Sequence, residues 1–192
     1  MMPALRYRGW KWRAMGLLLI GRQQGALDVF EAMLQEFPGD SYGLASKAHL
    51  QAQLGRRRDA LDTFRQLVAA DADNARHWFN YGYLLEELGE YGQAETALRR
   101  ATELSPKLDR AWYGLGLVLI RLQRFDEALV ALKKNTQLQP MSPYGWYQLA
   151  RVHVDRHEPE EALRIIRHLK RFEPKVAAQL ERETGIFVPP AS

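Results

Sequence analysis

The stretch DRAWYGLGLVLIRLQRFDEAL, residues 109–129, carries the spacing that decides the fold. Within it, Trp112 stands four residues before Gly116. A tryptophan also lies 34 residues upstream, at Trp78, and another lies 34 residues downstream, at Trp146. A constant separation of this length indicates a repeated structural unit rather than one isolated helix pair.

The 34-residue period continues through most of the chain without an insertion. Five units fit it: residues 7–40, 41–74, 75–108, 109–142 and 143–176. Position 20 of the unit is alanine in every copy: Ala26, Ala60, Ala94, Ala128 and Ala162. Position 8 is small in every copy: Ala14, Ala48, Gly82, Gly116 and Ala150. Position 24 is large and apolar in every copy: Phe30, Phe64, Leu98, Leu132 and Ile166.

This pattern predicts two antiparallel helices in each unit. Apolar residues at positions 4, 7 and 11 share one helical face, and those at positions 20, 24 and 27 share another. Small residues at positions 8 and 20 allow the two backbones to approach closely. Glycines near position 15 (Gly21, Gly55 and Gly89) suit the end of the first helix, where φ is positive. Prolines near position 32 end the second helix in most units.

These residues resemble the tetratricopeptide repeat over positions 7–176. The resemblance implies an all-α fold, a right-handed α-solenoid of five helix-turn-helix units whose first helices line a concave groove. Residues 177–185 are expected to form a capping helix, and residues 186–192 an extended tail. The second unit departs from the pattern at Lys47 and Ala72, and the fifth has RHEP at its turn, so both are expected to be less regular.

Composition and charge set limits on the function. The 192 residues are 46% hydrophobic, carry a formal charge of +4 and contain no cysteine. The longest apolar run, residues 15–21, is too short to span a bilayer. The basic residues before it resemble a secretory signal, but removal of a signal would delete Trp10, Ala14 and Leu17, which keep the repeat register. The sequence therefore favours a mature cytoplasmic protein.

No pattern of residues indicates catalysis. The spacing of His153 and His157 would place two imidazoles on one helix face, but no third ligand is evident, and His157 falls at a turn position. The sequence has no phosphate-binding loop and no nucleophile–base signature. It predicts a protein that is not an enzyme and that needs no cofactor or metal.

The resemblance also implies which side chains face the groove. Positions 2, 5, 6, 9, 12 and 13 of each unit line it in this family. The best candidates for partner contact are Arg76, Phe79, Asn80, Tyr83, Arg110, Tyr113, Tyr147 and Arg151. Aromatic residues and arginine dominate binding hot spots, although packing between repeats explains Phe79 equally well. Asn80 and Arg110 match the pattern of relatives that grip a peptide C-terminus, but Ala45, His49 and Gly114 do not.

The sequence therefore predicts a scaffold that holds a peptide segment or amphipathic helix of another protein, with apolar and some acidic residues. One alternative is self-assembly through the repeat ends or the apolar tail IFVPP.

A second alternative is an anionic ligand, RNA or lipid, bound by a basic ladder on the convex face. The ladder comprises Arg65, Arg99, Lys133 and Arg167, with Arg100, Lys134 and His168 beside them. Acidic residues near the starts of the same helices favour a simpler explanation, which is complementarity to the helix macrodipole. Nucleic acid is therefore not the favoured partner.

Overall fold

The computed structural model describes residues 2–189, which form eleven helices and no strand. The helices are α1 (Met2–Leu19), α2 (Gln23–Glu36), α3 (Ser41–Gln53), α4 (Arg57–Ala70), α5 (Ala75–Glu87), α6 (Tyr91–Leu104), α7 (Asp109–Arg121), α8 (Phe125–Leu138), α9 (Pro143–Asp155), α10 (Pro159–Leu169) and α11 (Pro174–Thr184). They fall into two compact units, Met1–Gly89 and Glu90–Ser192. The division lies inside the unit predicted for residues 75–108, so the partition into five repeats remains a prediction.

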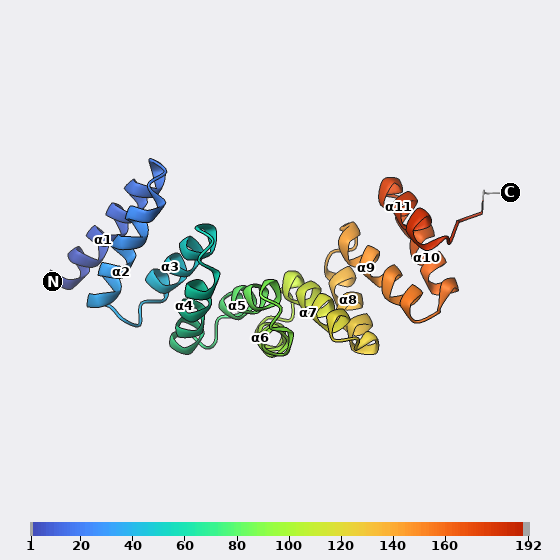
Figure 1. Ribbon diagram of the computed structural model, residues 1–192, viewed down its shortest axis with the longest axis horizontal. Coiled ribbons are helices and arrows are strands. Elements are labelled where there is room, and N and C mark those ends of the chain that lie inside the picture. Colours follow the sequence, from blue (N-terminus) through green and yellow to red (C-terminus); the bar gives the residue numbers. More distant parts are fainter. Residues whose placement is uncertain (1, 190–192) are drawn as a thin grey trace. The chain divides into compact units, whose positions relative to one another are not determined.

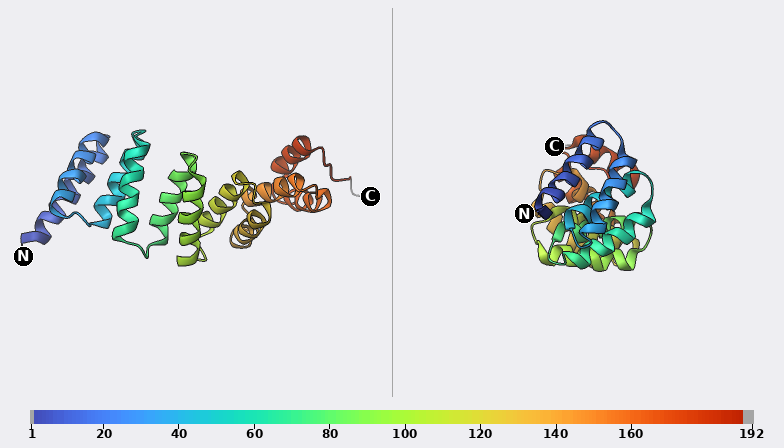
Figure 2. Two further views of the ribbon diagram at one scale, coloured as in Figure 1. Left: turned by 60° about the horizontal axis from the view of Figure 1, so that its bottom comes forward. Right: turned by 90° about the vertical axis from the view of Figure 1, so that its left-hand side faces the viewer.

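The first compact unit consists of two helix pairs and one further helix. α1 packs against α2, α3 packs against α4, and α5 packs against α4 (Figure 1). α2 also contacts α3, which joins the two pairs. The same pairing of α1 with α2 is visible in blue from the other directions of Figure 2. One cluster of apolar side chains, with Phe30 and Met33 almost fully buried, fills the space between α1, α2 and α3.

The second compact unit repeats this arrangement and adds a last helix. α6 packs against α7, α7 against α8, α8 against α9, and α9 against α10 (Figure 1). α11 packs against both α9 and α10. Ile166, Leu169 and Leu180 are fully buried where these three helices meet.

Close helix packing follows from the small residues of the repeat, as the sequence predicts. All five alanines at position 20 are 0% exposed: Ala26, Ala60, Ala94, Ala128 and Ala162. Gly116 shows why position 8 must be small, because a Cβ atom added there would lie 2.7 Å from Cγ of Leu132. Such a distance is far inside van der Waals contact, so α7 and α8 approach as closely as they do only without a side chain at Gly116.

Each of the turns that follow α1, α3, α5, α7 and α9 contains one residue in the left-handed conformation. Gly21, Gly55 and Gly89 have φ of 73°, 76° and 78°, as the sequence predicts. At the corresponding positions after α7 and α9, Gln123 and His157 adopt φ of 59° and 60°. These two residues therefore hold a conformation that suits glycine better than a residue with a Cβ atom.

The structure corrects several expected boundaries. α1 begins at Met2, before the predicted first unit. α10 ends at Leu169, and Pro174 does not stop it but opens α11, where proline fits the first turn. The capping helix is thus three residues longer at its start than the expected 177–185. Gly185 ends it in a left-handed conformation, with φ of 71°.

The prediction of two irregular units is half right. The second repeat, residues 41–74, contains α3 with 13 residues and α4 with 14. The helices α5 and α6 have these same lengths, and so do α7 and α8. In the second repeat, the ammonium of Lys47 lies 3.4 Å from the carboxylate of Glu31. The fifth unit is irregular, since α10 has only 11 residues.

The segment after α11 packs back onto the helix end. The backbone N–H of Val188 donates to the Glu181 carboxylate at 2.7 Å, and Ile186 and Val188 pack against the cluster formed by α9, α10 and α11. Of the predicted tail, residues 190–192 lie outside the described part of the chain. Among residues 2–189, no helix combines the length and the apolar character needed to cross a bilayer.

Candidate partner-binding surfaces

Four of the predicted contact residues lie on α5 in the first unit. Arg76 is exposed, Phe79 and Asn80 are half-buried, and the Tyr83 side chain is 53% exposed. Their spacing of three and four residues places them along one face of the helix. The Phe79 and Tyr83 rings lie 6.3 Å apart. This α5 face therefore combines an aromatic pair, an amide and a cation.

α3 extends the α5 face through His49. The Asn80 amide lies 3.4 Å from Nε2 of His49, and Nδ1 of the same ring lies 2.6 Å from the Ala45 carbonyl oxygen. The two contacts agree if Nδ1–H donates to the carbonyl and Nε2 accepts from the amide. The His49 ring also packs on the edge of Phe64. Asn80 thus contacts the neighbouring helix α3 through this ring.

Tyr83 is oriented at the end of the α5 face by a carboxylate. Its hydroxyl donates to Glu87 at 3.2 Å, and the Arg57 guanidinium of α4 lies 3.8 Å from the same carboxylate. The negative charge of Glu87 raises the pKa of Tyr83 above its ordinary value. Tyr83 therefore presents a fixed, neutral ring to solvent.

In the second unit, α7 supplies Arg110 and Tyr113. Arg110 is exposed. Tyr113 is half-buried and packs against the cluster that contains Leu129, Leu132 and Leu149. Its ring therefore contributes to packing as well as to the surface, which sequence reasoning did not foresee for this residue.

α9 and α11 together form the other part of the predicted site. The Tyr147 hydroxyl donates to the Glu183 carboxylate at 2.6 Å, and the Arg151 guanidinium lies 3.0 Å from the same oxygen. The hydrogen bond raises the pKa of Tyr147 and lowers the pKa of Glu183. Glu183 was missed by sequence reasoning, and its only signal was its place in the predicted capping helix.

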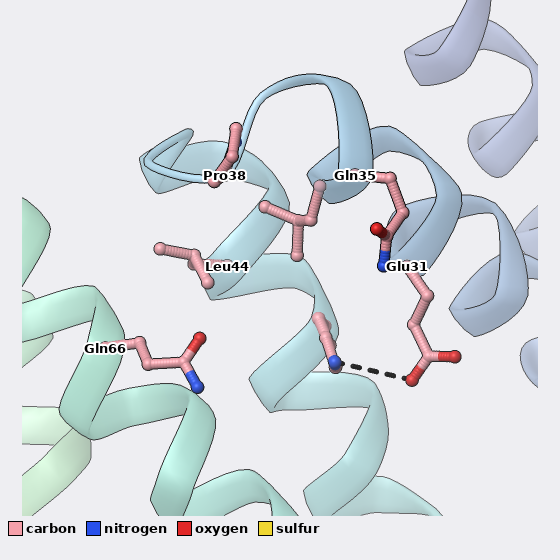
Figure 3. Close-up of a pocket in the computed structure, with 7 residues that line it drawn as sticks. Glu31, Gln35, Pro38, Leu44 and Gln66 are labelled. Atoms are coloured by element: carbon pink, nitrogen blue, oxygen red, sulfur yellow. Dashed lines mark ion pairs between the residues drawn. The ribbon is translucent and has the colours of Figure 1, made fainter.

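A hollow of about 430 Å³ lies between α2, α3 and α4, away from all eight predicted residues (Figure 3). Glu31, Gln35, Pro38, Leu44 and Gln66 line it, together with Leu34 and Lys47. Lys47 occupies position 7 of its repeat. The residues at the same position in α7 and α9, Leu115 and Leu149, are buried. Lys47 therefore lines the hollow with a polar end group, where a buried leucine occupies the same repeat position in α7 and α9.

Carboxylates lie beside three of the seven residues of the basic ladder. Arg65 pairs with Asp62 at 2.8 Å, and Arg99 pairs with Glu95 at 2.8 Å and with Glu127 at 2.6 Å. Arg100 lies 3.6 Å from Glu103. His168, the last member, packs between the rings of Trp146 and Phe172. These ion pairs weaken the field that Arg65, Arg99 and Arg100 present to an anion.

The histidine pair of the fifth unit is held apart by its turn. Nδ1 of His153, which is 6% exposed, lies 2.6 Å from the Glu158 carboxylate. His157 forms the left-handed turn and is exposed. The described residues contain no group of histidine and acidic side chains arranged to hold a metal ion.

Known proteins share both the repeat and the fold. The family model of the tetratricopeptide repeat matches residues 46–109 and 86–134. A crystal structure of MamA has a TM-score of 0.80 at 19% identity and covers 97% of this chain and 97% of its own. YrrB, a tetratricopeptide-repeat protein with an unusual peptide-binding site, has a TM-score of 0.79 at 20% identity. The match covers 88% of this chain and 88% of YrrB. A tetratricopeptide-repeat protein from Parabacteroides merdae has a TM-score of 0.82 at 21% identity. The match covers 93% of this chain and 73% of that protein's chain. No curated protein matches the chain.

Helix pairs, small residues at the pair contacts and left-handed turns define an all-α helical-repeat protein of the α-solenoid class. Residues 46–134 match the tetratricopeptide repeat, and the fold of the chain is similar to that of solved tetratricopeptide-repeat structures.

Proposed function

We propose that the protein is a non-enzymatic interaction module that binds a segment of another protein on the exposed faces of its first helices. The segment is an extended peptide or an amphipathic helix with apolar and some acidic residues. The observation that supports this most is the α5 face, where Tyr83 is 53% exposed yet held in place by Glu87 and the neighbouring Phe79 ring. Ordered, exposed aromatic residues offer contact area at a low entropic cost.

Charge selects the partner's chemistry. Arg76 on α5 and Arg110 on α7 are exposed, so each of the two helices offers a cation to a carboxylate of a partner. On α9, Arg151 and Tyr147 already hold the carboxylate of Glu183. The same pair of donors would suit an acidic residue of a partner. The peptide-binding site of YrrB, whose fold is similar, is consistent with a role of this kind.

The test is affinity capture from the native lysate, followed by a binding measurement on the captured partner. Tyr83→Ala with Arg110→Glu should weaken that binding while the helical circular dichroism stays unchanged, because both side chains are exposed. A matched control is Val130→Ala with Arg167→Glu, which changes an exposed apolar residue and an exposed cation on second helices. Equal binding by both double variants would rule out the first-helix faces as the site.

A further inference from the structure

α1 carries two apolar faces, and only one of them is packed. Ala14 is fully buried, and Trp10 and Leu17 pack against the cluster that α1 shares with α2. On the opposite side, Leu5, Trp12 and Leu19 are 67%, 72% and 83% exposed. Residues seven apart on an α-helix are offset by only about 20°, so these three side chains form a stripe.

Further apolar groups widen this stripe. Met15 is 45% exposed and Ile20, just beyond the helix, is 67% exposed. At Gly9 and Gly16 an added Cβ atom would meet nothing within 4 Å. We call the stripe, with Met15 and Ile20, the outer face of α1. The contacts of α1 with the cluster around α2 come from its packed face, through Ala14, Trp10 and Leu17.

The charges carried by α1 itself have one sign. Arg6, Arg8, Lys11 and Arg13 lie within α1, and the first acidic residue of the chain is Asp28. Arg6 is paired with Glu36, and Lys11 lies over the Tyr42 ring. Arg8 and Arg13 are exposed and form no ion pair with any residue between 5 and 189. An occupant of the outer face must therefore accept apolar side chains and supply negative charge.

These requirements decide between the candidate occupants. A second copy would bring two basic helices together, and like charges at close range oppose that contact. A lipid bilayer with anionic headgroups satisfies both requirements at once, since tryptophan and leucine enter the boundary of the acyl chains while arginine stays among the headgroups. We propose that α1 is an interfacial anchor that docks the protein on an anionic membrane surface.

The anchor lies on the membrane rather than across it. With 18 residues, α1 is about 27 Å long at 1.5 Å per residue. Four basic side chains within that length make a span unfavourable, and the packed face must stay on α2. In this orientation only the outer face enters the lipid. Because α5, α7 and α9 contribute nothing to it, the membrane contact and the proposed partner binding fail or succeed independently.

The experiment uses the whole protein and vesicles of phosphatidylcholine, with and without phosphatidylserine. We expect co-sedimentation with the anionic vesicles, a blue shift of tryptophan fluorescence, and weaker binding as salt rises. Arg8→Gln with Arg13→Gln should weaken the binding roughly 25-fold, about fivefold for each cation removed near the surface. Trp12→Ala should weaken the binding and also abolish most of the fluorescence shift. Both variants alter exposed side chains and should fold as the wild type does.

The matched control makes comparable changes on α8. Val130→Ala with Lys133→Gln and Lys134→Gln removes one exposed apolar group and two cations from the basic ladder, and it should bind vesicles like the wild type. Loss of binding in this control but not in the α1 variants would assign the lipid contact to the ladder and overturn the proposal. Equal affinity for both kinds of vesicle, or no binding at all, would also overturn it. So would a fall in molecular mass by light scattering in Trp12→Ala without a change in vesicle binding, because the outer face would then serve self-association.

Discussion

The hydroxyl of Tyr147 on α9 donates a hydrogen bond of 2.6 Å to the carboxylate of Glu183 on α11. Arg151 reaches the same oxygen at 3.0 Å. The last helix thus engages two residues that the repeat pattern assigns to the partner site. A partner that contacts Tyr147 must either displace this carboxylate or bind beside it, and the state of α11 becomes part of any binding measurement on α9.

Removing the carboxylate should change the titration of Tyr147. In Glu183→Ala we expect the pKa of Tyr147 to fall toward the ordinary value, because the hydrogen bond to a negative group raises it in the wild type. The shift can be followed by NMR of ring-labelled tyrosine as pH rises. Glu160→Ala, an exposed change on α10, serves as the control and should leave the titration as it is. An unchanged Tyr147 titration in Glu183→Ala would show that the two helices are not joined at this point.

Glu181 should give the end of the chain a stability that depends on pH. Its carboxylate is buried, pairs with Lys170 at 2.7 Å and accepts the N–H of Val188. The hydrogen bond from Lys170 is the main cause that lowers the pKa of Glu181 in the folded protein. Its stabilising contribution is therefore complete above the unfolded value of about 4.3 and is lost as pH falls through the lower folded value.

The comparison of wild type with Glu181→Gln tests this linkage. At neutral pH the variant should melt at a lower temperature, and the difference should shrink in acid until the two proteins melt together. Thermal unfolding at a series of pH values measures it. A difference that stays constant across the series would mean that the charge of Glu181 does not stabilise the fold.

The contact between Gly116 and Leu132 predicts a clear response to one methyl group. Gly116→Ala places a Cβ atom 2.7 Å from Leu132, and overpacking of this kind costs about 1–3 kcal/mol in the free energy of unfolding. Gly92→Ala is the matched control, because an added Cβ there meets nothing within 4 Å. That substitution should be neutral or stabilising by about 0.5–1 kcal/mol. Urea denaturation of both variants gives the comparison, and equal stability would contradict the close approach of α7 and α8.

The sequence predicts what repeats and misses what occurs once. Small residues at positions 8 and 20 have the same neighbours in each helix pair, so their burial follows from the pattern alone. The link from Glu183 to Tyr147 joins two residues that are 36 positions apart, and Glu183 lies beyond the five repeat units, so the period does not reveal it. The turn at Gln123 was missed for a different reason. A glycine at the turn position of a repeat indicates a left-handed residue, but a glutamine in the same conformation carries no signal in its own identity.

Replacing Lys47 by an apolar residue should raise the stability of the fold. Lys47→Leu should place a branched side chain beside Leu44 and Leu34, at the hollow between α2, α3 and α4. Filling such a space commonly raises the free energy of unfolding by about 0.5–2 kcal/mol. Lys47→Ala removes the same ion pair with Glu31 but fills nothing, so it should show no gain. If the two variants have equal stability in denaturant, the hollow is closed by other side chains and is not a packing defect.

The left-handed turn at Gln123 should lower the stability of the fold through backbone strain. A residue with a Cβ atom in this conformation is strained by about 1–2 kcal/mol, whereas glycine adopts it freely but loses more entropy on folding. Gln123→Gly should therefore raise the free energy of unfolding by a net amount of about 0.5–1 kcal/mol. The control is Gln123→Ala, which keeps the Cβ atom but also loses the exposed amide. A gain in stability that came only from losing the amide would appear in both variants. Urea denaturation should separate the two variants, with only the glycine variant more stable than the wild type. Equal stability would mean that the turn relaxes around the Cβ atom, and the φ of 59° at Gln123 would then carry no strain.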